Sequence, residues 1–377
     1  MTGRRPAATR RGLAILALAA VALLGGCAGA SAPAASPGAA TVPLSELVPV
    51  PDPRAWEGPS TAVLADEAIV PVSPDVRPAL PATVASHDVA GDTAVTVRDA
   101  SRVIAMDRAG ALAATIWGLG LGDLLVGRDA STSFPGTEGL PVVTGSGHTV
   151  NGESIVALAP TLVITDGSIG PRDVVEQLRD VGITVVTVRN VPSFAGAEQL
   201  ARDVAAVFGV PEQGERLASR IAGDIASAVA EVKGVAPAAP DDRVRMLFLY
   251  VRGAAGVYYL FGEESGADAL IEALGGVDVA GELGWAGMRP MTDEAMAAAN
   301  PDLILVMTHG LASAGGVDGL LAQKPAIAVT AAGEHRRFVD MADAQVLSFG
   351  PRSGDVVRAL ARAVYAPDGR SRAETEG

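Results

Sequence analysis

Short runs of aliphatic and β-branched residues alternate along the chain with longer stretches in which apolar residues recur at helical spacing. In the first half, strands are predicted at 93–97, 102–105, 124–126, 162–165 and 184–188. The alternation returns after residue 240, with strands predicted at 245–251, 257–261, 303–307, 338–340 and 345–347. Strands separated by helices are typical of parallel α/β sheets. The pattern therefore predicts two α/β lobes, one over residues 91–192 and one over residues 241–365.

Residues 193–235 show no strand pattern and are predicted to form a helical connector between the lobes. One helix is predicted over 194–208 and a second from Pro211 to Lys233, since proline suits the first position of a helix. At about 1.5 Å per residue the second helix would be about 35 Å long. Its apolar residues recur at spacings of three and four, which predicts one buried stripe. They are Leu217, Ile221, Ile225, Val229 and Val232.

The two lobes repeat one segment. Asn151-Gly-Glu153-Ser-Ile-Val-Ala-Leu-Ala-Pro160 resembles Thr292-Asp-Glu294-Ala-Met-Ala-Ala-Ala-Asn-Pro301, and each is followed by a predicted strand. In both copies the glutamate stands seven residues before the proline. Each segment predicts a short helix with an acid in its first turn, where the helix dipole favours a negative charge.

The N-terminus has the pattern of an export signal. Arg4, Arg5, Arg10 and Arg11 precede an apolar run of about 12 residues, too short for the roughly 20 residues that a membrane-spanning helix needs. Residues 1–26 are therefore predicted to be a signal peptide. Leu24-Gly25-Gly26-Cys27 follows, contains the only cysteine of the chain, and resembles a bacterial lipobox. Cys27 is the predicted site of lipidation.

Residues 27–90 are rich in alanine, proline and serine and are predicted to form a tether, and residues 366–377 a polar tail. The predicted location is the extracytoplasmic face of the cell membrane, with the protein attached through its lipid.

Composition narrows the function. Hydrophobic residues make up 49% and charged residues 19% of the 377 residues, which excludes a wholly disordered chain. The net charge is −14. Since residues 1–26 hold four arginines and no acid, the rest carries 25 basic and 43 acidic groups, or −18. Nucleic acid is therefore not an expected partner. The chain lacks Gly-x-Ser-x-Gly, His-Glu-x-x-His and Walker motifs, so we expect a binding protein and no enzyme. We also expect the protein to be a monomer.

Two lobes, one long connecting helix, a lipobox and the repeated glutamate segment together resemble a substrate-binding protein of an ABC importer. The resemblance is to the iron-siderophore, corrinoid and haem binders and covers about residues 90–365. It implies the class III periplasmic-binding-protein fold, with two Rossmann-like lobes joined by a single long interdomain helix. It also implies an ABC permease with its ATPase as partner. In that family each lobe presents one acidic residue to the permease, and Glu153 and Glu294 occupy the matching positions.

More narrowly, the chain resembles the haemin-binding lipoproteins of actinobacterial haem uptake. The motifs that carry this resemblance are Ser131-Thr-Ser-Phe-Pro135, Val143-Thr-Gly-Ser-Gly-His148, Leu249-Tyr250-Val-Arg252-Gly253, Met307-Thr-His-Gly310 and Phe349-Gly-Pro-Arg-Ser353. In those proteins a histidine and a tyrosine, one from each lobe, bind the haem iron from opposite faces. His148 and Tyr250 fall on those motif positions, with Arg252 two residues after the tyrosine. The resemblance implies that the protein captures haem and delivers it to the permease.

The chemistry of these residues agrees with that role. His148 follows a glycine-rich loop after a predicted strand, and neutral imidazole is a common axial ligand of haem iron. Tyr250 ends an apolar strand, and a phenolate oxygen suits ferric iron. Arg252 projects to the same side at i+2 and would stabilise the phenolate. Met307 ends another strand and would give the cleft an apolar wall against the porphyrin.

The sequence leaves other ligands, and other ligand-binding residues, possible. A ferric siderophore or a corrinoid would suit the same fold and both glutamates but would leave His148 and Tyr250 without a role. A zinc or manganese site would need three or four ligands, of which His148 and His309 could supply two. A structural adhesin would not require paired surface acids. Candidates for the haem carboxylates, all beside predicted loops, are Arg128, Ser131, Thr132, Arg289 and Arg352.

Overall fold

A computed structural model describes residues 41–145 and 148–372 of the chain. The first sheet has the strand order β5 (Leu125–Arg128), β4 (Val103–Met106), β6 (Leu162–Thr165) and β7 (Thr184–Thr187), all parallel. Side chains alternate between its faces. Ile104 and Val163 face helices α2 (Gly152–Ala157) and α3 (Arg172–Asp180), whereas Val103 and Ile164 face α1 (Ala111–Gly118). Both faces are thus covered, as in an α/β lobe.

The second sheet is larger and mixed. Its main order is β1 (Ser60–Ala62), β13 (Phe338–Met341), β12 (Leu303–Met307), β8 (Arg245–Arg252), β9 (Val257–Phe261) and β11 (Met288–Pro290), and β10 (Val277–Asp278) pairs with β8. The first four are parallel, whereas β9 pairs antiparallel with β8, and β11 pairs antiparallel with β9. One face packs on α8 (Asp293–Ala299), α10 (Gly316–Gln323), α11 (Pro325–Ala328) and α12 (Ala331–Glu334). The other face packs on α6 (Ala267–Ala273) and α14 (Ser353–Tyr365).

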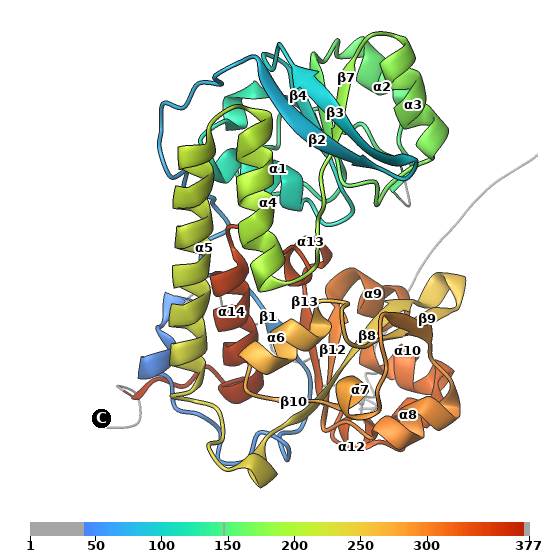
Figure 1. Cartoon of the computed structure of the whole chain (residues 1–377). Coiled ribbons are helices and arrows are strands. Elements are labelled where there is room, and N and C mark those ends of the chain that lie inside the picture. Colours follow the sequence, from blue (N-terminus) through green and yellow to red (C-terminus); the bar gives the residue numbers. More distant parts are fainter. Residues whose placement is uncertain (1–40, 146–147, 373–377) are drawn as a thin grey trace, which may run out of the picture. The chain divides into compact units, whose positions relative to one another are not determined.

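The helical connector forms as predicted. Helix α4 (Phe194–Val207) begins at Ser193, whose hydroxyl accepts a hydrogen bond from the Gly196 N–H, and α5 (Pro211–Val232) lies against it (Figure 1). The apolar stripe of α5 is buried against α4 and α14. One continuous core therefore extends from the first sheet through α1, α4, α5 and α14 to the second sheet. The predicted fold class is confirmed by this architecture.

The repeated segment also has the same structure twice. Helix α2 leads to β6 in the first lobe, and α8 leads to β12 in the second. Asn151 and Thr292 cap these helices by accepting hydrogen bonds from the N–H groups of Ser154 and Ala295. The residues before the two prolines, Ala159 and Asn300, both have positive φ, 44° and 35°.

The predicted tether is wrong for residues 41–90. Leu44 and Leu47 are buried in the core, and β1 pairs with β13 in the second sheet. Strand β2 (Ala82–Asp88) then forms an antiparallel hairpin with β3 (Gly91–Val97). Prolines break helical periodicity, but an extended segment can still bury isolated apolar side chains and add an edge strand. Residues 27–40 and the predicted signal peptide lie outside the described residues.

Residues 63–81 lead from β1 in the second sheet to β2 beside the first lobe, so they add a second connection to that made by α5. The predicted strand at 93–97 belongs to the hairpin and not to the parallel sheet. The predicted polar tail is also packed in part, because Arg370 O accepts a hydrogen bond from the Val48 N–H and Ser371 pairs with Leu47.

The strand predicted at 345–347 is wrong, because residues 343–346 form helix α13 (Asp343–Val346). Apolar residues in so short a segment cannot distinguish a strand from one helical turn. The remaining short helices are α7 (Val279–Glu282) and α9 (Thr308–Ser313). Within residues 41–145 and 148–372, no helix has both the length and the apolar character needed to cross a membrane.

Candidate functional site

Tyr250 lies near the end of β8, on the face of the second sheet that packs on α14. Leu247, Leu249 and Val251 face the opposite core, so Phe248, Tyr250 and Arg252 share one face. The Tyr250 ring is stacked on Phe261, with 5.9 Å between ring centroids and 10° between the planes. Its hydroxyl forms no hydrogen bond with another described residue. The ring is thus held by packing, and its oxygen is available to a ligand.

Arg252 is fixed beside this ring. Its guanidinium carbon lies 4.6 Å from the centroid of the Tyr250 ring, a cation–π contact. Nη2 forms an ion pair of 3.1 Å with Asp343 Oδ2, and Nη1 donates to Val251 O at 2.8 Å. Asp343 Oδ1 also accepts a hydrogen bond from the His309 backbone N–H at 3.0 Å. The positive charge therefore covers the face of the phenol and is itself anchored by a carboxylate.

Met307 ends β12 on the same face of the sheet. The last registered pair of β12 and β8 is Val306 opposite Leu249, so Met307 lies in register with Tyr250 one residue further on. Its side chain is 8% exposed and belongs to the shared core. Met307 can present only a small apolar area beside Tyr250.

His148 lies in a tight turn of the first lobe, after β5. Its φ is +61°, the left-handed region that non-glycine residues seldom adopt. On either side of it, the Gly145 N–H donates to Thr149 O at 2.7 Å and the Val150 N–H donates to Gly170 O at 2.7 Å. Its Nδ1 is buried without a hydrogen-bond partner among the described residues. The imidazole is half-buried, and this nitrogen faces into the protein.

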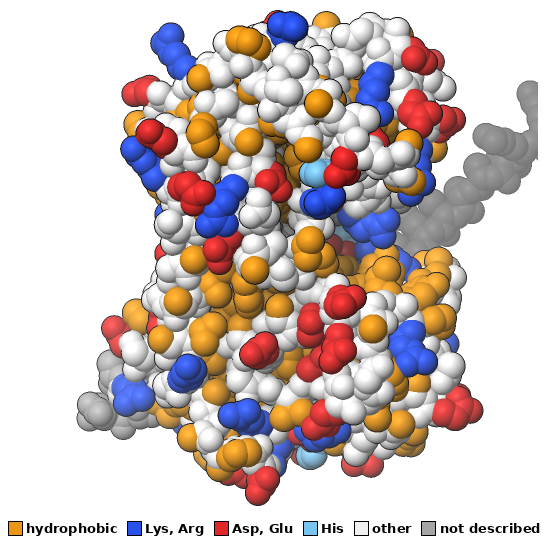
Figure 2. Space-filling model, in the orientation of Figure 1, with side chains coloured by type: hydrophobic (Ala, Val, Ile, Leu, Met, Phe, Trp, Pro, Cys, Tyr) orange, Lys and Arg blue, Asp and Glu red, His pale blue; other side chains and the backbone are white. Residues whose placement is uncertain are grey.

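The electrostatic surroundings of His148 come from both lobes. Burial lowers the pKa of His148, the charges of Arg108 and Arg252 lower it further, and Asp129 and Asp343 oppose this. Arg252 and Asp343 belong to the second lobe and contact Tyr250 or its neighbours. The structure thus brings His148 into the same electrostatic environment as the Tyr250 group. On the face shown in Figure 2, hydrophobic side chains gather in a hollow near histidine, basic and acidic side chains.

Sequence reasoning missed two buried acids beside His148. Asp107 and Asp129 directly follow β4 and β5 and are fully buried. Asp107 accepts hydrogen bonds from the N–H groups of Ala111 and Leu112 at 3.0 Å each, and Asp129 accepts from Thr132 at 2.8 Å. Burial, followed by the charge of Asp129, raises the pKa of Asp107 well above its ordinary value. Their position after strands was the available signal, and they hold the loops around the site in place.

The arginines and the serine predicted to meet the haem carboxylates have other partners. Arg128 donates to the carbonyl oxygens of Thr132 and Leu140, and Arg352 is buried beside Phe134 at 5.5 Å from its ring centroid. Arg289 lies over the Trp285 ring at 5.2 Å. Thr132 is buried, and the Ser131 hydroxyl donates to Arg108 O at 2.6 Å.

The structure also places the other histidine and metal candidates. His309 lies on α9 with an exposed side chain, and only its backbone N–H contacts Asp343. Across the described residues, no group of three or more His, Cys, Asp or Glu side chains is arranged to hold a metal ion.

Glu153 and Glu294 are exposed residues in the first turns of α2 and α8. Neither forms an ion pair with a described residue. Glu153 also lies at the edge of a groove of about 800 Å³ between α2 and α3, whose apolar lining includes Val156, Val174 and Val181. Both carboxylates are therefore open to a partner.

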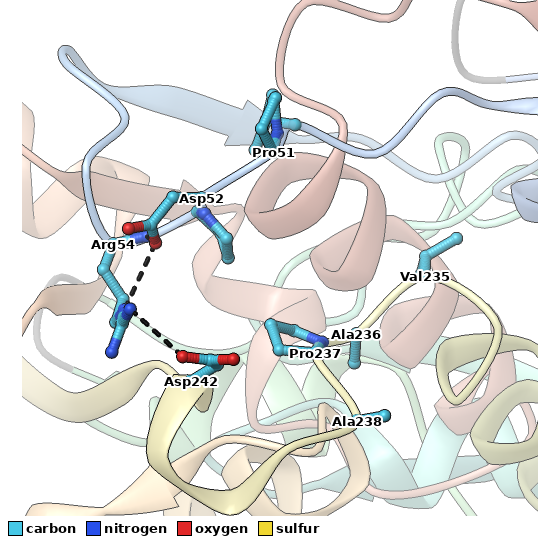
Figure 3. Close-up of a pocket in the computed structure, with 10 residues that line it drawn as sticks. Pro51, Asp52, Arg54, Val235, Ala236, Pro237, Ala238 and Asp242 are labelled. Atoms are coloured by element: carbon cyan, nitrogen blue, oxygen red, sulfur yellow. Dashed lines mark hydrogen bonds and ion pairs between the residues drawn. The ribbon is translucent and has the colours of Figure 1, made fainter.

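A second pocket, of about 410 Å³, lies between residues 50–54 and the segment after α5 (Figure 3). Arg54 crosses it with ion pairs to Asp52 at 3.2 Å and to Asp242 at 3.5 Å. None of the predicted site residues lines this pocket, so it is distinct from the site around His148 and Tyr250.

The fold and the paired lobes define a periplasmic binding protein, and comparison with known families agrees. The model of the periplasmic binding protein family matches residues 109–344, so the chain belongs to this family. Its members bind substrates for transport, which confirms the expectation of a binding protein rather than an enzyme. A similar curated protein is the uncharacterized ABC transporter substrate-binding lipoprotein YvrC of Bacillus subtilis (strain 168). It is 27% identical over 255 residues, which are 67% of this chain and 76% of that protein.

Solved structures of haem-binding proteins are also similar. The heme binding protein HmuT is 41% identical with a TM-score of 0.77, over 83% of this chain and 99% of that chain. The periplasmic heme-binding protein RhuT from Roseiflexus sp. RS-1 is 33% identical with a TM-score of 0.63, over 72% and 100%. In three further HmuT structures, one histidine, one tyrosine and the arginine two positions after that tyrosine are each replaced by alanine.

Proposed function

We propose that this protein captures haem between its two lobes, with His148 and Tyr250 as axial ligands of the iron, and delivers it to an ABC permease. The observation that carries the proposal is the meeting of three features from separate parts of the chain. These are the half-buried imidazole of His148, the Tyr250 hydroxyl, which forms no hydrogen bond with another described residue, and the Arg252–Asp343 pair, whose charges act on His148 and whose guanidinium lies over the Tyr250 ring.

The chemistry of the two side chains suits ferric haem. Burial lowers the pKa of His148 and so favours the neutral imidazole, which is the form that binds iron. Tyr250 would supply a phenolate oxygen, a donor that suits ferric iron, and the guanidinium of Arg252 lies over its ring. Met307 would add an apolar contact beside Tyr250.

The similar HmuT structures support this assignment. HmuT is a heme binding protein, and its substituted tyrosine and arginine have the same i, i+2 spacing as Tyr250 and Arg252. A histidine is also substituted in HmuT, and His148 is the histidine proposed as a ligand in this chain. A siderophore or corrinoid ligand would give no reason for this triad.

A spectroscopic titration tests the proposal. Purified apoprotein mixed with haemin should give a shifted, saturable Soret band at one haem or more per chain, and a ferric siderophore or cobinamide in excess should not displace it. A double variant, His148→Ala with Tyr250→Phe, should lose the shifted band while it keeps the thermal unfolding midpoint. An unshifted band with the wild-type protein, or a normal band with the double variant, would contradict the ligand assignment.

Permease docking through Glu153 and Glu294 is the second part of the proposal. Both carboxylates are exposed, lack partners within the described part of the chain, and lie at equivalent positions of the two lobes. Glu153→Ala and Glu294→Ala should each lower haem transport by the reconstituted permease without changing haem affinity. Glu212→Ala is the matched control, since Glu212 is also an exposed acid in the first turn of a helix. Equal transport by all three variants would exclude docking through these residues.

The third part is the lipid anchor at Cys27, which would hold the protein at the extracytoplasmic face of the membrane. Its support is the lipobox-like sequence and the lipoprotein relative. Cys27→Ser should release the protein from the membrane fraction into the medium. Retention of the variant in the membrane would rule out this anchor.

A further inference from the structure

Arg108 occupies a fixed position at the ligand-binding edge of the first sheet. It follows β4, an inner strand, by two residues, and carboxyl ends of parallel strands are where α/β proteins bind ligands. Its N–H donates to Ser168 Oγ at 2.9 Å, and its carbonyl oxygen accepts from the Ser131 hydroxyl at 2.6 Å. The loops that follow β5 and β6 therefore hold the Arg108 backbone from both sides.

The guanidinium of Arg108 has few hydrogen-bond partners among the described residues. It is exposed, and over residues 41–145 and 148–372 it forms one hydrogen bond, from Nη2 to Ser168 O at 2.9 Å. No carboxylate pairs with it within the described residues, whereas Arg252, the cation of the second lobe at this site, is paired with Asp343. Arginine carries five N–H donors, so most of those on Arg108 have no partner in the part of the chain that the structure describes.

Arg108 is also connected to the His148 turn. Ser168, its hydrogen-bond partner, lies two residues before Gly170, and Gly170 pairs with Thr149, the neighbour of His148. The positive charge of Arg108 contributes to the lowered pKa of His148, which agrees with this proximity.

We propose that Arg108 binds a propionate carboxylate of the haem held by His148 and Tyr250. The inference rests on the proposed function, since it assigns a contact to that same ligand. Haem carries two carboxylates, and the chain after residue 26 has a net charge of −18, so attraction must come from a local cation. A guanidinium can form two parallel charge-assisted hydrogen bonds with a carboxylate. Arg108 is exposed at this site and has no carboxylate partner among the described residues, unlike Arg252.

The test combines a protein variant with a ligand variant. Arg108→Gln should weaken haemin binding by about 5-fold, the upper range for an exposed ion pair. Haemin dimethyl ester, which lacks both carboxylate charges, should bind the wild-type protein and Arg108→Gln equally well in the same buffer. Arg108→Lys should recover part of the haemin affinity because it keeps the charge.

Arg102→Gln is the matched control. Arg102 precedes β4 at the opposite end of the same strand, is exposed, and donates to the backbone carbonyls of Leu158 and Ala159. Its substitution should leave both affinities unchanged. Unchanged haemin affinity in Arg108→Gln, or an equal loss for the dimethyl ester, would overturn the assignment of Arg108. Failure of the wild-type protein to bind either ligand would overturn the proposed function as well.

Discussion

The two lobes present their candidate ligands in different ways. Tyr250 belongs to a strand, is stacked on Phe261 and is covered by an arginine that Asp343 anchors. His148 belongs to a turn with positive φ, and its Nδ1 has no partner in the described part of the chain. In the second lobe, packing thus holds the candidate ligand side chain, Tyr250, in position. In the first lobe, the candidate ligand side chain, His148, is carried by a turn.

This difference assigns separate tasks to the lobes. A side chain held by packing and by neighbouring charges pays little entropy when it binds, so Tyr250 should contribute most to affinity. A histidine on a turn can adjust its position when the iron arrives. The comparison predicts that variants of the Tyr250 group and of His148 will differ in size of effect, in rescue and in pH dependence.

The largest effect is expected for Tyr250→Phe. The variant removes the oxygen ligand but keeps the ring that packs on Phe261, so haemin affinity should fall by at least about 100-fold, beyond most losses of an outer-shell partner. Thermal unfolding should not change. Tyr258→Phe is the control, since it loses a hydroxyl that is bonded to Gln323 on the other face of the sheet. Equal losses for the two variants would remove the special role of Tyr250.

A smaller loss, about 10-fold or more, is expected for His148→Ala. Because the imidazole of His148 is only half-buried, its removal should leave a site that solvent can reach. Added imidazole should therefore restore the spectrum of this variant, and it should not restore that of Tyr250→Phe. Spectra and affinities measured with and without imidazole decide this. His309→Ala should bind haemin normally. If His309→Ala lost binding instead, the ligand of the first lobe would be wrongly assigned.

A loss of about 10-fold at most is expected for Asp343→Asn. The amide oxygen can still accept the His309 N–H, but Arg252 loses its ion pair and its fixed position over the phenol. The measurements are the haemin affinity and the position of the phenolate-to-iron charge-transfer band. This band would not shift if Asp343 had a purely structural role. Higher affinity in this variant would mean that Asp343 acts mainly by neutralising Arg252.

The smallest effect concerns pH. The pKa of His148 lies below its ordinary value of 6.5, so the neutral imidazole predominates at pH 6.5 and its fraction rises further towards pH 8. The affinities of wild type and His148→Ala should therefore run parallel with pH in this range. Below it, protonation of His148 removes its contribution and the two curves converge. A difference that grows steadily between pH 6.5 and 8 would show that His148 is protonated in the free protein.

Residues 41–90 and the surroundings of the site show where sequence patterns fail. Proline-rich composition suggested a tether, yet Leu47 is fully buried and β1 completes the second sheet. Apolar periodicity detects a face only when several buried residues recur, and an extended segment that buries one side chain at a time leaves no such signal. The strand predicted at 345–347 failed for the related reason that a single helical turn is too short to show its period.

The sequence by itself determined the two lobes, the connecting helices, the two exposed glutamates and the chemistry of His148 and Tyr250. Each of these depends on residue types and their spacing within a short segment of the chain. Only the tertiary structure decided that Asp343, 91 residues after Arg252, holds that arginine over the phenol, and that Arg108 keeps its charge unpaired within the described residues. These depend on which distant loops meet at the ends of two sheets. Charge pairing and burial act through space, and the order of residues along a chain does not contain those distances.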